Sequence, residues 1–339
     1  MQDEHFVLDL VERAKTRRDA RRGFLRAAGG AAAVVGGLSM LAACNDDDTP
    51  LPTPTPTPSP TPTAVTEADV LNFALNLEYL EAQFYSFAAF GVGLAANLTT
   101  GTGVQGAVTG GRQVTFQDPI VGQYAREIAY DEIAHVTFLR NALQGAAVSQ
   151  PAINISGDAN GAFTAAARAA QVVGATATFD PYASDNNFLL AAYLFEDVGV
   201  TAYMGGVQLL TTPATIEAAA GIHAVEAYHA GLVRTLLYRK GVTDTSIITA
   251  TTRISDARDT LDGTASTGLL GQGADRDQGI ASETVNGQVR SNIVPTDANG
   301  LAFVRSPAQV LNIVYLTPNA STTSGGFFPA GVNGTVRST

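Results

Sequence analysis

Two stretches of the chain decide the fold, EIAYDEIAHVTFLR at 127–140 and VEAYHAGLVR at 225–234. Each holds a Glu-x-x-His pair, Glu132/His135 in the first and Glu226/His229 in the second. In an α-helix, residues three apart lie about 60° apart around the axis and one turn along it. Each pair therefore presents a carboxylate and an imidazole on one helix face, and each helix can offer two ligands to one point.

The same order of residues occurs twice. An apolar, helix-patterned segment with a lone glutamate precedes each pair: Glu78 comes before the first and Glu196 before the second. Seven residues after each lone glutamate lies a tyrosine, Tyr85 and Tyr203 respectively. Seven residues make nearly two helical turns, so each tyrosine shares the face of its glutamate. The chain therefore predicts four long helices in two similar halves.

Alignment of the halves also separates two neighbouring glutamates. Glu78 aligns with Glu196, whereas the counterpart of Glu81 in the second half is Gly199. We therefore expect Glu78 to face the shared site and Glu81 to lie beside the ligands or on the surface.

A lone Glu-x-x-His pair is more often part of a solvated helix face than a metal site. Here the neighbours are apolar and predict buried helices: Ile128, Ile133, Phe138 and Leu139 in the first stretch, and Ile222, Val225 and Leu232 around the second. An unpaired buried charge costs several kcal/mol, so the carboxylates need partners. Arg140 and Arg234 each lie about 80° from the glutamate of their own helix and are poorly placed for this. Two divalent cations would balance the four carboxylates, with two neutral imidazoles completing the ligand set.

With these residues in view, the chain resembles the ferritin-like superfamily, whose di-iron and di-manganese members carry this arrangement. The resemblance implies an all-α, ferritin-like four-helix bundle that binds two Fe or Mn ions. The implied ligands are Glu78, Glu132, His135, Glu196, Glu226 and His229. LNFALNLEYLEAQFY (71–85), EIAYDEIAHVTFLR and GGFFPAGVNGTVR (325–337) further resemble the exported ferritin-like proteins grouped with plant desiccation-related proteins.

Four other titrating side chains are weaker candidates for contact with the ligands. Asp131 could orient His135 from one turn away, although a surface position is an equal alternative. His223 could be a spare ligand, a neighbour of the ligands or a solvated residue. Tyr85 and Tyr203 could hydrogen-bond ligand carboxylates across the bundle, while a core position with the hydroxyl satisfied elsewhere is the commoner case.

The first 44 residues predict export. Arg21-Arg22 begins a weakly apolar, Gly/Ala-rich stretch that ends in Leu41-Ala42-Ala43-Cys44. A twin-arginine start and a small-residue end are typical of an export signal. Leu-Ala-Ala-Cys resembles a bacterial lipobox, which would make Cys44 a lipidated residue and the membrane a partner. The alternative is cleavage nearby and release of a soluble protein, so we expect a lipid-anchored, periplasmic or extracellular protein of the cell envelope.

Composition divides the rest of the chain. Residues 45–65 form an acidic and Thr/Pro-rich linker, in which alternate prolines favour an extended tether. Cys44 is the only cysteine, so no disulfide can hold the mature fold together. Beyond residue 44 there are 13 basic and 26 acidic residues, a net charge of −13 that disfavours electrostatic binding of nucleic acid. The sequence leaves a homo-oligomer possible.

Caps and periodicity give approximate helix bounds within a bundle at 66–242. We expect helices from Glu67 to about Phe90, from Pro119 to about Gly145, from Asp185 to about Leu210, and from Pro213 to Gly241. The connection at 146–183 is long enough to cross the bundle, with a short Ala-rich helix within 162–173. The extension at 243–339 predicts irregular chain, turns at Asp262-Gly263 and Asn333-Gly334, short strands, and one further helix at Pro307–Leu316. Phe327-Phe328-Pro329 could insert into the bundle or into a partner subunit.

Two classes of function remain. In the first, paired Fe or Mn ions act on peroxide or dioxygen, as in a catalase, peroxidase or ferroxidase. In the second, the protein is a non-enzymatic envelope protein for stress, desiccation or assembly, with a structural metal site or none. The ligand types alone do not distinguish Fe from Mn, nor turnover from a structural role.

Overall fold

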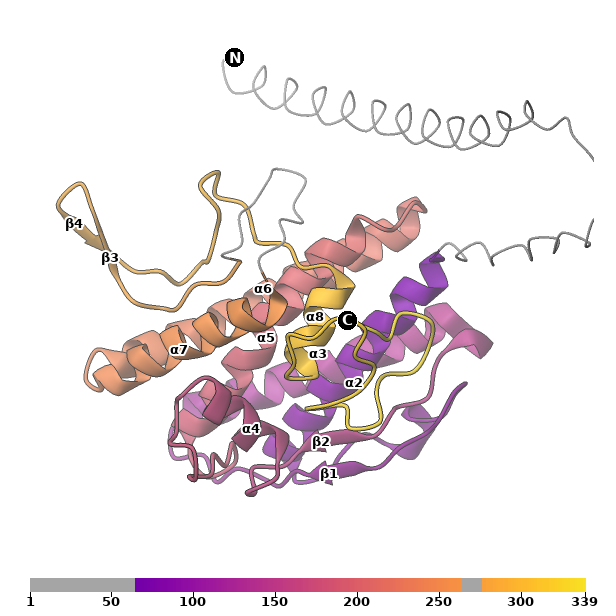
Figure 1. The fold of residues 1–339 in the computed structure, drawn as a ribbon, viewed down its shortest axis with the longest axis horizontal. Helices are drawn as coiled ribbons and strands as arrows, with labels where there is room; N and C mark the ends of the chain where they lie inside the picture. Colours follow the sequence, from indigo (N-terminus) through magenta and orange to yellow (C-terminus); the bar gives the residue numbers. More distant parts are fainter. Residues whose placement is uncertain (1–64, 264–275) are drawn as a thin grey trace, which may run out of the picture. The chain divides into compact units, whose positions relative to one another are not determined.

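Four long helices form the core, as Figure 1 shows: α2 (Glu67–Phe90), α3 (Pro119–Leu143), α5 (Asp185–Val207) and α6 (Pro213–Gly241). The computed structural model describes residues 65–263 and 276–339; the expected export signal, Cys44 and the expected linker as far as residue 64 lie outside the described residues. Within the bundle α2 packs along α3 and α5 packs along α6, with further contacts that join the two pairs. The all-α bundle core expected from the sequence is confirmed.

Side-chain caps fix where these helices begin. The Thr66 hydroxyl accepts from the Asp69 N–H while the Asp69 carboxylate accepts from the Thr66 N–H, which forms a capping box. Asp118 and Ser184 cap α3 and α5 in the same manner by accepting from N–H groups of the first turn. α3 and α5 end two or three residues before the expected positions, at Leu143 and Val207.

The α3–α5 connection crosses the bundle, as expected. It contains β2 (Ile153–Ile155), which pairs in parallel with β1 (Val108–Gly110) from the α2–α3 connection, with Val108 opposite Ile153. The connection also contains α4 (Ala162–Ala169), shorter than the Ala-rich stretch suggested. Two 3₁₀ turns, Ala96–Leu98 and Gln144–Ala146, complete this part of the chain.

The extension holds one long helix that the sequence reading missed. α7 (Thr245–Asp262) begins at Asp244, whose carboxylate accepts from the Ser246 N–H. Its buried face mixes Ile247 and Ile254 with Arg258 and Asp262, so no continuous apolar stripe marks it in the sequence. The short elements that follow are the antiparallel pair β3 (Glu283–Val285) and β4 (Gln288–Arg290), and then α8 (Pro307–Val314).

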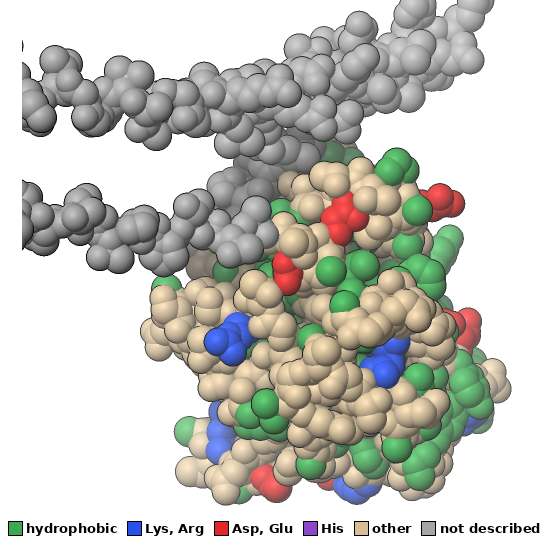
Figure 2. All heavy atoms as spheres, turned by 90° about the vertical axis from the view of Figure 1, so that its right-hand side faces the viewer, with side chains coloured by type: hydrophobic (Ala, Val, Ile, Leu, Met, Phe, Trp, Pro, Cys, Tyr) green, Lys and Arg blue, Asp and Glu red, His purple; other side chains and the backbone are tan. Residues whose placement is uncertain are grey.

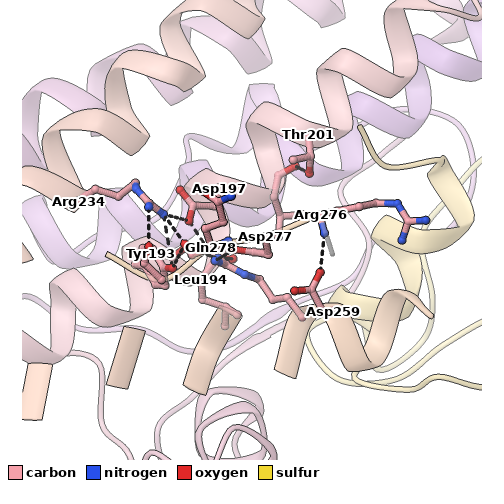
Figure 3. Close-up of polar contacts among 12 residues, drawn as sticks. Tyr193, Leu194, Asp197, Thr201, Arg234, Asp259, Arg276, Asp277 and Gln278 are labelled. Carbon is pink, nitrogen blue, oxygen red and sulfur yellow. Dashed lines mark hydrogen bonds and ion pairs between the residues drawn. The ribbon is translucent and has the colours of Figure 1, made fainter. Parts of the chain in front are cut away.

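Buried ion pairs attach the extension to the bundle (Figure 3). Asp197 on α5 accepts from Arg234 on α6 at 2.8 Å and from Arg258 on α7 at 3.0 Å. Arg258 also donates to Asp277 at 2.6 Å, and Arg305 donates to Asp277 at 3.1 Å. These charged side chains are almost fully buried, and their mutual pairing makes that burial tolerable.

The C-terminal segment packs on the bundle of its own chain. The Phe327 ring lies 5.1 Å from Phe163 and 4.9 Å from Phe195, measured between ring centroids. Asn333 exchanges two backbone hydrogen bonds with the Asn76 side chain on α2, at 2.9 Å each. Of the two positions left open for Phe327, the structure has the intramolecular one.

α5 is long and apolar enough to cross a membrane by length and composition, and it is the one such helix among the described residues. Its most apolar window is 78% buried inside the protein, as befits a central helix of a bundle.

One core expectation is wrong: Phe138 on α3 is 47% exposed and lies outside the buried stripe.

Candidate metal centre

The six expected ligand residues converge inside the bundle. α2 supplies Glu78 and α5 supplies Glu196, while α3 and α6 supply one Glu-x-x-His pair each. All four glutamates are fully buried, and the two histidines are buried to nearly the same extent. The helix faces deduced from the residue spacing thus meet around one point in the core.

The ligand atoms fall into two groups that share two residues. Glu78, Glu132, His135 and Glu226 form one group, in which every ligand atom lies within 4.8 Å of the others. Glu132, Glu196, Glu226 and His229 form the second group under the same limit. Glu132 and Glu226 belong to both, so they are placed to bridge two ions, and each ion would have one glutamate and one histidine of its own.

Both imidazoles present Nδ1 to this cluster. His135 Nδ1 lies 3.2 Å from Glu78 Oε2 and 3.6 Å from Glu226 Oε1. His229 Nδ1 lies 3.2 Å from Glu132 Oε1. The two rings are 6.2 Å apart between centroids, with the bridging carboxylates close to both.

Six atoms of the cluster are buried without a hydrogen-bond partner. They are both carboxylate oxygens of Glu132, both of Glu226, Glu196 Oε2 and His229 Nδ1. The last atom approaches Glu132 closely but without hydrogen-bond geometry. Orphaned buried oxygens are costly, and a carboxylate and imidazole donor set suits divalent Fe, Mn or Zn ions. The residues present therefore fit two bound cations.

Electrostatics support the same interpretation. Burial, with the nearby Glu132 carboxylate, raises the pKa of Glu78 to about 7 despite the opposing effect of His135. Burial and the surrounding carboxylates raise the pKa of Glu226 well above its usual range. Burial would lower the pKa of His135, but the neighbouring glutamates Glu78 and Glu132 raise it to about 11. A cation bound here would compete with protons for these atoms, so its binding would release protons.

Tyr85 and Tyr203 each contact the ligand glutamate of the opposite half. The Tyr85 hydroxyl donates to Glu196, and the Tyr203 hydroxyl donates to Glu78. Both tyrosines are buried, and burial raises the pKa of each phenol well above its usual value. They therefore act as neutral donors that hold the two terminal carboxylates in place.

Asp131 contacts a different histidine from the one expected. Its Oδ2 lies 3.1 Å from Nε2 of His229 on α6, whereas His135 had been the expected partner. Helix packing brings α3 and α6 together at this level, so the contact runs between helices and not along one turn. The Asp131 side chain is 45% exposed, which places this edge of the centre next to solvent.

Glu81 and His223 take different positions. His223 Nδ1 lies 3.1 Å from the Val200 carbonyl oxygen, and His223 belongs to neither ligand group. Glu81 is buried beside the cluster, and burial together with the carboxylates of Glu132, Glu196 and Glu78 raises its pKa well above the usual range. It too belongs to neither group.

Gly199 has a role that the sequence reading missed. A Cβ atom at this position would lie 2.3 Å from Glu226 Oε2 and 3.5 Å from Glu81 Oε1. The missing side chain therefore leaves room for the Glu226 carboxylate. Alignment of the two halves had marked this position, because Gly199 is the counterpart of Glu81, but only the packing shows why a glycine is needed there.

The two arginines on the ligand helices point elsewhere. Arg140 donates to the Tyr79 hydroxyl and the Thr100 carbonyl, both at 2.6 Å. Arg234 donates to Asp197 and to backbone carbonyls of the extension (Figure 3).

A bundle whose facing helices supply four buried carboxylates and two histidines is of the ferritin-like type, and this cluster could hold metal ions. Comparison with known proteins agrees. Residues 66–239 match the family model described as a ferritin-like domain, and the chain belongs to this family.

Two curated relatives are similar over most of their length. The desiccation-related protein PCC13-62 of Craterostigma plantagineum is 31% identical over 257 residues, which cover 73% of this chain and 76% of the relative. The ferritin-like catalase Nec2 of Nesocodon mauritianus is 30% identical over 282 residues, which cover 80% and 86%. No solved structure gives a significant match.

Proposed function

We propose that the protein binds two Fe or Mn ions in its bundle and acts on peroxide or dioxygen, as a catalase-like, peroxidase or ferroxidase protein of envelope stress protection. The observation that carries the proposal is the pair of ligand groups that share Glu132 and Glu226. These residues would hold two redox-active ions, which would supply the chemistry that acts on peroxide or dioxygen. A relative described as a ferritin-like catalase supports peroxide as the substrate.

The chain would contribute position, charge and exclusion of water. Two redox-active ions, when bound, would take two electrons from one peroxide molecule, which loses two protons and becomes dioxygen. They would pass these electrons to a second peroxide molecule, which takes up two protons and becomes two waters. The four carboxylates balance the charge of two divalent ions, and Tyr85 and Tyr203 fix the terminal carboxylates. The buried helices around the site keep bulk water from competing for these contacts.

A second candidate is a non-enzymatic envelope protein of stress or desiccation, with a structural metal site or none. The observation in its favour is the similarity to a desiccation-related protein over most of both chains. In this role the ions would stabilise the bundle by binding only its folded form.

We propose further that the protein is exported and reaches the membrane through Cys44, and that nucleic acid is not a partner. The twin-arginine stretch and the lipobox-like end of the leader support export. The face in Figure 2 carries scattered single charges of both signs and no basic patch, in keeping with the acidic composition.

The test begins with metal analysis of protein purified from its native compartment, followed by dioxygen release from peroxide and by ferrous-ion oxidation. The wild type should hold about two Fe or Mn ions per chain. Glu132→Ala removes a bridge between both ions, so bound metal should fall toward one or none, and the melting temperature should fall with it.

Glu127→Ala is the matched control, because Glu127 lies on the same helix and is exposed. It should leave metal content and melting temperature unchanged. Two bound ions without turnover of peroxide, dioxygen or ferrous ion would favour the structural role. Equal metal content and equal melting temperature in wild type and Glu132→Ala would contradict the metal centre itself.

A further inference from the structure

A small cavity lies among α2, α5, α8 and the C-terminal segment, with a volume of about 20 Å³. Its apolar walls include Leu77 and Leu80 from α2, Val198 from α5, Val314 from α8 and Phe327 from the C-terminal segment. We call this cavity, by these lining residues, the apolar chamber. The extension thus supplies part of a wall that the four-helix bundle alone would lack.

The apolar chamber borders the metal centre. Its lining also includes Glu81 and Gly199, together with Leu194, Phe195 and Ile313, and Glu81 is the one ionisable residue among them. A Cβ at Gly199 would lie 2.3 Å from Glu226 Oε2. The Glu226 carboxylate therefore lies directly beside the part of the lining that Gly199 forms. Leu77 also precedes the ligand Glu78 directly in the chain.

The chamber lies between the two halves of the pseudo-symmetric bundle, because α2 and α5 both line it. Position 81 carries a carboxylate and its counterpart, position 199, carries a hydrogen atom. The Glu81 side chain approaches the space above Gly199, where a Cβ would lie 3.5 Å from Glu81 Oε1. Gly199 therefore lies between the chamber and the Glu226 carboxylate, while Asp131 marks a different, solvent-exposed edge of the centre.

The volume and the lining of the apolar chamber determine which molecule it can hold. A cavity needs roughly 10–15 Å³ to hold one water-sized molecule, so this one accommodates a single small molecule. A buried water or hydrogen peroxide needs two to four polar partners, and the lining offers one ionisable side chain. Dioxygen needs no hydrogen bond and favours an apolar site over water.

We propose that the apolar chamber binds dioxygen next to the metal centre. Residues of α8 and Phe327 form one wall of this chamber. Whether dioxygen leaves or enters through the chamber rests on the proposed function. Dioxygen formed from peroxide would leave through the chamber, and dioxygen consumed in ferrous-ion oxidation would enter through it. Binding of dioxygen itself depends on the cavity and not on turnover.

The test uses dioxygen as the probe and methyl groups as reporters. The full chain, labelled at Ile, Leu and Val methyl groups and loaded with redox-inert zinc, is studied by NMR under dioxygen pressure and under nitrogen at the same pressure. Dioxygen is paramagnetic and speeds the relaxation of nearby methyl groups. The enhancement at Leu80, Val198 and Val314 should exceed several-fold that at Val310, which is buried on α8 but does not line the chamber.

Two matched variants locate the effect. Val314→Ile adds one methylene group to the chamber wall and should abolish the enhancement at Leu80 and Val198. Val310→Ile makes the same change elsewhere on α8 and should preserve it. Leu80→Ala, which enlarges the cavity, should increase the enhancement at Val198. Metal content should stay at the wild-type level in the two valine variants.

Equal enhancement at Val198 and Val310 in the wild type would overturn the proposal, as would an unchanged enhancement in Val314→Ile. Failure of the proposed function has a different signature. A protein that binds dioxygen in the chamber but turns over neither peroxide nor ferrous ion retains the dioxygen site and loses only its assigned chemistry. In an active protein, Val314→Ile should slow turnover more than Val310→Ile does.

Discussion

At the scale of single residues, Gly199 is the position where the smallest change should have a large effect. Gly199→Ala would place a methyl carbon 2.3 Å from Glu226 Oε2, so the bridging carboxylate must move. We expect bound metal to fall from about two ions toward one or none per chain, as measured by elemental analysis.

Gly206→Ala on the same helix is the control for this prediction. The nearest atom to a Cβ at Gly206 is Val70 Cγ1 at 3.8 Å, an ordinary contact, so metal content should not change. Full metal content in Gly199→Ala would show that the bridge can move without loss of binding.

Asp131 makes the two halves of the centre unequal. It lies within hydrogen-bond distance of His229 Nε2, while the corresponding position in the second half, Val225, has no carboxylate to offer His135. Loss of such a contact to a ligand histidine costs about 10–100-fold in metal affinity. In Asp131→Asn, one of two ions should therefore bind more weakly by this factor in a competitive chelator titration.

The exposed Glu127→Gln on the same helix should leave both affinities as they are. Equal weakening of both ions in Asp131→Asn would show that the aspartate acts on the bundle as a whole and not through His229.

At the scale of elements, the four bundle helices could be predicted because local rules determine them. Capping residues mark the starts of three helices in the sequence: Thr66, Asp118 and Ser184. The residue spacing then places the expected ligands on the inner helix faces. α7 could not be predicted in this way, since its buried face carries Arg258 and Asp262, which are stable there only through partners distant in sequence. The Asp131–His229 contact and the need for Gly199 likewise depend on how helices pack.

The ion pairs of the extension should contribute strongly to stability. Arg305 is fully buried and donates to Asp262 at 2.6 Å and to Asp277 at 3.1 Å. Arg305→Met leaves these carboxylates with one cation fewer, and breaking a buried pair typically costs about 3–5 kcal/mol. The free energy of unfolding, measured in urea on the metal-free chain, should fall by about this amount.

Arg290 provides the comparison. It pairs with Glu283 at 2.9 Å on the surface, where both side chains are largely exposed. Arg290→Met should change the unfolding free energy by less than about 1 kcal/mol. Similar losses in both variants would mean that the buried cluster is no more important than a surface pair.

At the scale of the whole molecule, the leader predicts where the protein works. Cys44→Ala should release the protein from the membrane fraction or block its maturation, because the variant would lack the proposed lipid attachment site. Arg21→Lys together with Arg22→Lys should retain it in the cytoplasm. Immunoblots of membrane, soluble and secreted fractions measure both effects. Normal membrane fractionation of the Cys44→Ala protein would contradict the lipid anchor.

The docking of the C-terminal segment also sets the order in which the molecule can be assembled. Asn333 bonds to Asn76 across 257 positions of sequence, and Phe327 covers apolar rings beside the metal centre. Contacts between such distant residues form slowly, because the intervening chain must first be closed into a loop. A ribosome must therefore have synthesised residues 325–334 before this side of the bundle can close. Until then the wall of the apolar chamber lacks Phe327, and a protease or an aggregating neighbour can reach the rings that this segment will cover.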